Sequence, residues 1–207
     1  AMLSQSLDLI VIVDGQSTIA NVVVQPLGLF IFLLAGLAEL GRTPFDIHHA
    51  ESEVIGGSFI EYSGAHWSVF FLAEYINTFA VAALTVLLFL GGWSGPFLTR
   101  NWEIIWFLAK VYAGILVIFW IRGTFPRLRI DQLMAFAWKV MVPLSFYAII
   151  ITAVYLFYGW PPWTLTLMSL AGLLVVGYAI YRRFAGPASQ AAQVRARYLA
   201  LQSRSGE

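Results

Sequence analysis

The chain has 207 residues, of which 60% are hydrophobic and 11% are charged, and its formal net charge is +1. Soluble domains carry about a quarter charged residues, so most of this chain must be surrounded by lipid. The charge balance excludes the basic face that binds nucleic acid, and the lack of cysteine excludes disulfides, thiolate metal sites and iron–sulfur clusters on this chain.

The distribution of apolar residues predicts membrane-spanning helices. A bilayer core about 30 Å thick needs roughly 20 apolar residues per helix. We therefore predict an all-α, polytopic membrane protein with about five transmembrane helices. In chain order we expect a preceding segment over 1–18, a helix over 19–39, an acidic cytoplasmic loop over 40–65, helices over 66–90 and 103–121, a basic cytoplasmic loop over 122–134, helices over 135–158 and 163–181, and a cytoplasmic tail over 182–207.

Positive charges predict which loops face the cytoplasm. If the five spans alternate in direction, Arg42, the arginines of the 122–134 connection and those of the tail after Tyr181 fall on one side. Cytoplasmic loops carry an excess of lysine and arginine, so this side is predicted to be cytoplasmic. The tail, rich in helix formers and arginine, could lie on the membrane surface or on a partner.

An acidic run follows the first predicted span, which closes at Glu39. Mutual repulsion and partial burial raise the pKa values of carboxyl groups, and groups that exchange protons near neutral pH suit a proton relay. A solvated acidic loop is the alternative, and both interpretations remain open on the local sequence. The acids of the loop are Asp46, Glu51, Glu53 and Glu61.

Glu74 lies about two turns inside the second predicted span, where an ionised carboxylate costs roughly a few kcal/mol. Its side chain is expected to face a protein interior or water, with a structural hydrogen bond between helices as the alternative. The neighbouring Phe70, Phe71 and Tyr75 could line an apolar cavity, or simply pack or face lipid. Helical spacing places further polar residues on the stripe of Glu74, namely Asn77, Thr78 and Thr85.

Two lysines lie in later spans. Lys110 in the third span has Glu103 seven residues earlier on the same helical face, so it could snorkel or pair across helices. Lys139 lies near the cytoplasmic end of the fourth span, where snorkelling fits better. Together with Glu74 they form a broken line of ionisable residues, the pattern of a proton path.

A metal site is not expected. His48 and His49 are adjacent, so they cannot both face one metal from a regular helix, and His66 is far away at a span start. No phosphate-binding loop, nucleophile elbow or zinc motif occurs in the sequence.

Several motifs occur in order between about Gln25 and Pro143. They are A-E-L-G-R-T-P-F-D, A-E-S-E, I-E-Y-S-G, F-F-L-A-E-Y, K-V-Y and R-G-T-F-P-R-L-R-I-D-Q-L-M-A-F-A-W-K. Together they resemble the C-terminal part of the H subunit of respiratory complex I, NADH:quinone oxidoreductase, also called subunit 1. The resemblance implies part of a larger all-helical subunit that joins the membrane arm to the peripheral arm, helps form the quinone cavity, and links quinone reduction to proton translocation through acidic residues.

The resemblance also implies roles for individual residues. The proton-coupling acids would be Glu39, Asp46, Glu51, Glu53, Glu61 and Glu74; the quinone-cavity residues Tyr75 and Arg122, with Phe71 beside them; and the contacts to the peripheral arm Arg127, Arg129 and Asp131. The chain would bind no redox cofactor, since quinone is the substrate and NADH, FMN and iron–sulfur clusters belong to partner subunits. The partners would be other membrane and peripheral-arm subunits, and the location the prokaryotic cytoplasmic (inner) membrane rather than the mitochondrial inner or thylakoid membrane.

The chain departs from the family pattern in three places. His48 and His49 stand where the family has a Pro-Glu pair or another acid. About four earlier spans of the family, with part of the quinone chamber, are not among these residues, whereas the stretch Trp163–Tyr181 looks like an addition. Three other functions remain open: the corresponding subunit of a membrane-bound hydrogenase or another complex I relative, a secondary transporter or ion channel, and a structural scaffold.

Overall fold

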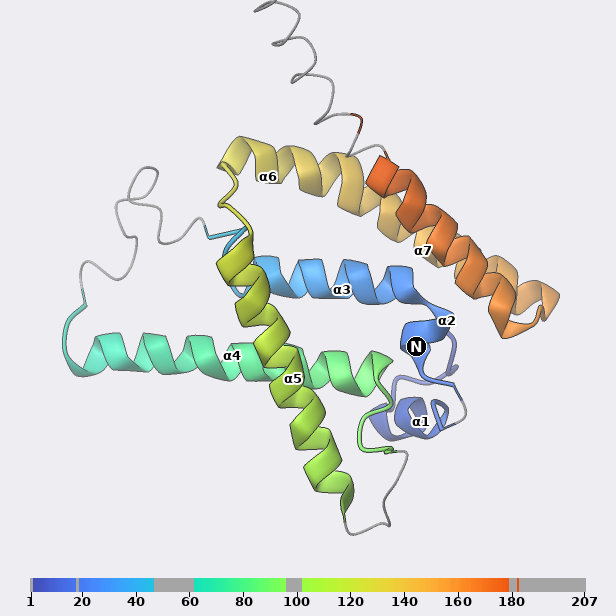
Figure 1. The fold of residues 1–207 in the computed structure, drawn as a ribbon, viewed down its shortest axis with the longest axis horizontal. Coiled ribbons are helices and arrows are strands. Elements are labelled where there is room, and N and C mark those ends of the chain that lie inside the picture. The colour runs from blue at the N-terminus through green and yellow to red at the C-terminus, as the bar shows by residue number, and fades with distance from the viewer. Residues whose placement is uncertain (1, 18, 47–61, 96–101, 179–181, 183–207) are drawn as a thin grey trace, which may run out of the picture. The chain divides into compact units, whose positions relative to one another are not determined.

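A computed structural model describes residues 2–17, 19–46, 62–95, 102–178 and 182 (Figure 1). These residues form helices and connecting turns, with no strand among them. The predicted all-α, polytopic class is therefore confirmed. The chain divides into two compact units, residues 1–169 and 170–207.

The first unit contains most of the described helices. Their bounds are α1 Leu9–Asp14, α2 Asn21–Val24, α3 Pro26–Glu39, α4 Ala65–Phe89, α5 Glu103–Thr124, α6 Ile130–Phe136, a π-helical turn η3 Ala137–Met141, and α7 Val142–Tyr158. A further helix, Pro162–Tyr178, starts in the first unit and continues in the second.

Three helices in the described part of the chain are long and apolar enough to cross a membrane: Ala65–Phe89, Glu103–Thr124 and the continuous helix Ile130–Tyr158. Two shorter apolar helices, Pro26–Glu39 and Pro162–Tyr178, accompany them. These helices place the protein in a membrane.

The stretch from Ile19 to Glu39 holds two helices. The backbone of Gln25 leaves the helical region, with φ −136° and ψ 65°, and α3 begins at the next residue, Pro26. Proline lacks the N–H that would continue a helix but suits a first helical position, where that N–H has no partner anyway. The side chain of Gln25 instead donates a hydrogen bond from Nε2 to Thr152 Oγ1 in α7, over 2.9 Å.

The core of the first unit forms where α3, α4 and α5 meet, with α5 packed across α4 (Figure 1). Phe45, just beyond α3, is buried and stacks on Phe136 of α6 at a ring-centroid distance of 6.3 Å. This packing fixes the turn after α3 against α4 and α5. The buried members of the cluster are Leu37, Leu40, Phe45, Ala82, Val86, Val111 and Ile118.

A glycine allows α3 and α4 to approach closely. A Cβ atom on Gly36 would lie 2.6 Å from Val81 Cγ1 in α4, too close for two carbon atoms. Replacing Gly36 with alanine is expected to cost about 1–3 kcal/mol of stability, because the helices must move apart. The loss would be measured as a lower unfolding temperature of the purified protein assembly.

Gly123 in α5 provides the matched control, because a Cβ there would meet nothing within 4 Å. Its replacement by alanine is expected to be neutral, or to stabilise by up to about 1 kcal/mol through helix propensity. Equal effects of the two substitutions would show that α3 and α4 do not pack closely at Gly36.

Candidate functional site

The site is built on the turn that follows α3. Gly41 adopts φ +57°, a left-handed conformation that ends the helix without steric cost. Phe45 N then donates a hydrogen bond to Arg42 O over 2.8 Å and closes a tight turn. Leu40 and Phe45 are both buried in the core. Arg42, which lies in the turn between them, is buried as well.

Two hydrogen bonds tie this turn to the end of α5 and the segment behind it. Thr43 Oγ1 donates to Arg122 O over 3.0 Å, and Leu128 N donates to Pro44 O over 3.0 Å. The Thr43–Pro44 peptide bond is cis. The two hydrogen bonds fix the turn against the end of α5 and the segment that follows it.

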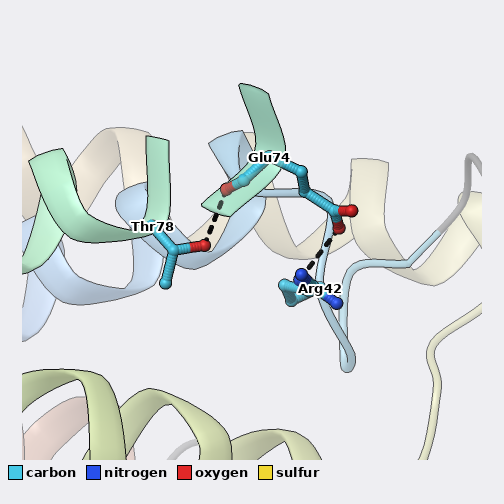
Figure 2. A network of polar contacts seen from close by, with 3 residues as sticks. All are labelled: Arg42, Glu74 and Thr78. Carbon is cyan, nitrogen blue, oxygen red and sulfur yellow. Dashed lines mark hydrogen bonds and ion pairs between the residues drawn. The ribbon is translucent and has the colours of Figure 1, made fainter. Parts of the chain in front are cut away.

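Arg42 forms an ion pair with Glu74 of α4, with 2.9 Å between Arg42 Nε and Glu74 Oε1 (Figure 2). The two side chains are only 9% and 15% exposed. Thr78, one turn along α4, donates from Oγ1 to the backbone oxygen of Glu74 over 2.9 Å, so its hydroxyl serves the helix rather than the carboxylate. The carboxylate of Glu74 thus faces the protein.

One donor of the Arg42 guanidinium group makes no hydrogen bond among the residues that the structure describes. Its Nη2 atom is buried and makes no hydrogen bond in the described part of the chain, and the contact of Nε with Glu74 is an ion pair rather than an aligned hydrogen bond. A buried donor without an acceptor generally costs about 1–3 kcal/mol, and more when it is charged. The site therefore favours any group that brings an acceptor oxygen to Arg42.

Aromatic rings lead along α4 to this guanidinium group. The ring centroids of Trp67 and Phe71 lie 5.1 Å apart, and those of Phe71 and Tyr75 lie 4.9 Å apart. Arg42 Cζ lies 5.4 Å from the centroid of the Tyr75 ring, within the range of a cation–π contact. We call Trp67, Phe71 and Tyr75 the aromatic stripe. These residues are 42%, 38% and 40% exposed, so a flat apolar molecule can reach the aromatic stripe.

The other predicted residues lie around this group or outside the described residues. Glu39 is exposed at the last position of α3, and Asp46 is partly buried at the end of the turn and has an interaction of its own. Glu51, Glu53 and Glu61, like His48 and His49, lie outside the described residues. The side chains of Arg122, Arg127, Arg129 and Asp131 are exposed at or after the end of α5.

The residue that the sequence analysis missed is Arg42, which served there only as a charge marking the cytoplasmic side. A signal was present, because an arginine three positions after Glu39 in an acidic run is a natural partner for a membrane carboxylate. Within the described residues, no group of three or more histidines or acids could hold a metal ion.

The helices and the buried pair define an all-helical membrane protein with a charged site in its interior. Comparison with known sequences gives the family: the family described as NADH dehydrogenase matches residues 1–153. The chain belongs to this family, and the resemblance drawn from its motifs is confirmed.

Relatives from several bacteria share close to half of their aligned residues with this chain. The H subunit of the NADH-quinone oxidoreductase of Geobacillus kaustophilus (strain HTA426) is 50% identical over 155 residues, which are 74% of this chain and 46% of the relative. That of Dehalococcoides mccartyi (strain ATCC BAA-2266 / KCTC 15142 / 195) is 49% identical over 152 residues, or 73% and 42%. The H subunit numbered 2 of Rhizobium meliloti (strain 1021) is 47% identical over 153 residues, or 74% and 46%. The chain thus spans less than half the length of these curated relatives.

Proposed function

We propose that the chain is a membrane subunit of a proton-pumping NADH:quinone oxidoreductase, in which it forms part of the quinone cavity and of the acidic path that couples quinone reduction to proton translocation. The relatives of the chain carry the name of that enzyme's H subunit. The observation that carries the finer proposal is the buried pair of Arg42 and Glu74 beside the exposed aromatic stripe.

The aromatic stripe suits the ring of a quinone. Quinone rings are flat and apolar, so they stack on the faces of aromatic side chains, and their two carbonyl oxygens accept hydrogen bonds. Arg42, whose Nη2 makes no hydrogen bond within the described ranges, lies at the end of the stripe with Cζ 5.4 Å from the centroid of the Tyr75 ring. A quinone that moved along the stripe would meet this donor with a carbonyl oxygen.

The ion pair offers a way to pass charge onward. A quinone that accepts two electrons gains negative charge until two protons convert it to the quinol. Negative charge close to Arg42 competes with Glu74 for the guanidinium group, because opposite charges attract strongly where water is excluded. Glu74, released from its partner, would then take up a proton, and the change of charge would pass to Glu39, Asp46 and the other acids of the loop.

The electrons in this proposal come from elsewhere in the complex. NADH, FMN and iron–sulfur clusters would lie on partner subunits of the peripheral arm, with Arg127, Arg129 and Asp131 as contacts to that arm. Arg122 would border the quinone cavity near the turn that carries Arg42. The complex would reside in a prokaryotic inner membrane.

Replacing Phe71 with leucine tests the quinone part of this proposal. Leucine stays apolar but has no aromatic face, so the KM for a short-chain quinone is expected to rise about threefold to tenfold, as the loss of one aromatic contact predicts. The measurement is NADH oxidation by the assembled complex in membranes at varied quinone concentration.

Phe146 in α7 provides the matched control, since it is 61% exposed and lies outside the aromatic stripe. The same change there should leave the KM unaltered. An unaltered KM in the Phe71 variant would remove the aromatic stripe from the quinone cavity.

A further inference from the structure

Residues from the N-terminal region and from α5 cover the C-terminal end of α4. After Phe89 the backbone turns through Gly91 and Gly92, which are both buried and adopt φ +69° and +51°. The last four carbonyl groups of a helix have no partner inside it, and lipid supplies none. Val86 O accepts hydrogen bonds from Leu90 N and Gly92 N in the turn directly after the helix, and the carbonyl oxygens that follow need donors from elsewhere in the protein.

Two side chains from the N-terminal region supply some of these donors. Gln16 Nε2 donates to Leu87 O over 2.9 Å, and Asn21 Nδ2 donates to Leu88 O over 2.9 Å. Gln16, which is 4% exposed, also accepts a hydrogen bond from Gly91 N over 3.0 Å. Segments about 70 positions apart thus join at this helix end.

Lys110 of α5 binds the carbonyl oxygens that follow, beginning with the C-cap residue Leu90. Its Nζ atom donates to Leu90 O over 2.8 Å, to Gly92 O over 3.1 Å and to Ser94 O over 2.7 Å. An ammonium group has three N–H bonds, so these acceptors use all of its donors. The positive charge also lies at the end of α4 where the helix dipole is negative.

These contacts favour a fixed charge over a proton carrier. A proton carrier needs a neighbour that accepts or returns the proton, whereas the three acceptors of Lys110 are backbone carbonyl oxygens. Such oxygens bind a cation through hydrogen bonds but do not take up protons near neutral pH. The interpretation of Lys110 as part of a proton path, which its sequence position allowed, therefore gives way to that of a cap on α4.

The cap and the ion pair are joined by one continuous helix, α4, although the row of residues between them winds around it, because four residues turn through about 400°. Glu74, Thr78, Ala82 and Val86 follow one another at four-residue spacing, and the last three of them are buried. Leu90, whose oxygen accepts from Lys110, is the next position of this row. A shift or rotation of α4 at its capped end would therefore also move the carboxylate that faces Arg42.

We propose that Lys110 is a positioning residue: its ammonium group caps the C-terminal end of α4 and thereby holds Glu74 in register with Arg42. The effect on turnover rests on the function proposed above, whereas the cap itself does not. Lys110 would therefore be required as a cation with N–H donors, and apolar packing alone would not replace it.

The test uses the full-length subunit in the assembled complex. Lys110→Met keeps the length of the side chain but removes its charge and its donors. In this variant the rate of hydrogen–deuterium exchange over Leu90–Ser94 is expected to rise about tenfold, and quinone-dependent turnover is expected to fall about tenfold. Lys110→Arg should retain more than about half of the turnover. Arg182→Met is the control, because the Arg182 side chain is exposed and has no part in the proposed site, and it should match the wild type in both measurements.

Chemical rescue separates charge from packing. In Lys110→Ala, added n-propylammonium replaces the lost side-chain atoms and should restore turnover. Two control compounds should not restore it: n-propanol lacks the charge, and tetramethylammonium lacks N–H donors. Equal rescue by n-propanol would overturn the proposal. If Lys110→Met fails to assemble, assembly of Lys110→Arg but not of Lys110→Gln supports the cap, and assembly of Lys110→Gln contradicts it.

The two measurements also separate this proposal from the function on which it rests. Raised exchange with wild-type turnover in Lys110→Met would overturn the link to Glu74 and leave the proposed function intact. Wild-type turnover in Glu74→Gln would instead reject the proposed function, and the exchange measurement would remain the test of the cap.

Discussion

Replacing Glu74 with glutamine is expected to lower quinone-dependent NADH oxidation about tenfold to a hundredfold while the complex still assembles. Glutamine keeps the shape of the side chain but can neither carry negative charge nor take up a proton. The ion pair with Arg42 is lost, and with it the proposed step that passes charge onward. Turnover in membranes with a short-chain quinone measures this loss, and ferricyanide-dependent NADH oxidation measures how much complex has assembled.

Glu103 provides the matched control for this substitution. It is an acidic residue in the first turn of α5, and its side chain is exposed. Glu103→Gln is expected to turn over like the wild type. If Glu74→Gln also turned over like the wild type, Glu74 would have no part in coupling.

Replacing Arg42 with methionine is expected to have the largest effect on stability. The substitution leaves the carboxylate of Glu74, only 15% exposed, without its partner in the protein interior. Breaking a buried ion pair in this way generally costs about 3–5 kcal/mol. The cost would appear as a lower unfolding temperature of the purified complex, or as a smaller amount of assembled complex in the membrane.

A second substitution distinguishes this cause from simple loss of packing. When both members of a buried pair become apolar, most of the stability returns, because no unpaired charge remains. Arg42→Met combined with Glu74→Leu should therefore be more stable than Arg42→Met alone, although inactive with quinone. The exposed Arg182, changed to methionine, serves as the control. Equal stability of the single and double variants would contradict a buried, charged Glu74.

The fold class followed from composition and span length, since a chain so apolar and so poor in charge has few soluble alternatives. Glu74 could be chosen from the sequence for a related reason: an acid deep in an apolar stretch must find a polar partner. The sequence made Arg42 a candidate for that partner but could not place it, because the turn that brings Arg42 beside α4 depends on tertiary contacts of Phe45 and Thr43. Local sequence does not contain those contacts.

The environments of Lys110 and Gln25 also depend on tertiary structure that the local sequence does not reveal. The sequence position of Lys110 allowed snorkelling or a pairing across helices, and the structure gives it the carbonyl oxygens of Leu90, Gly92 and Ser94 after α4. The stretch over 19–39 is apolar enough for one span, yet the backbone leaves the helix at Gln25 before Pro26. Hydropathy measures composition and is insensitive to such a break.

The central claim is that Glu74 changes its protonation when the quinone is reduced. Infrared difference spectra of the complex, reduced minus oxidised, measure this directly through the C=O stretching band of a protonated carboxyl group. We predict that such a band appears in the wild type and in Glu103→Gln and is missing in Glu74→Gln. The same band at full intensity in Glu74→Gln would contradict the claim.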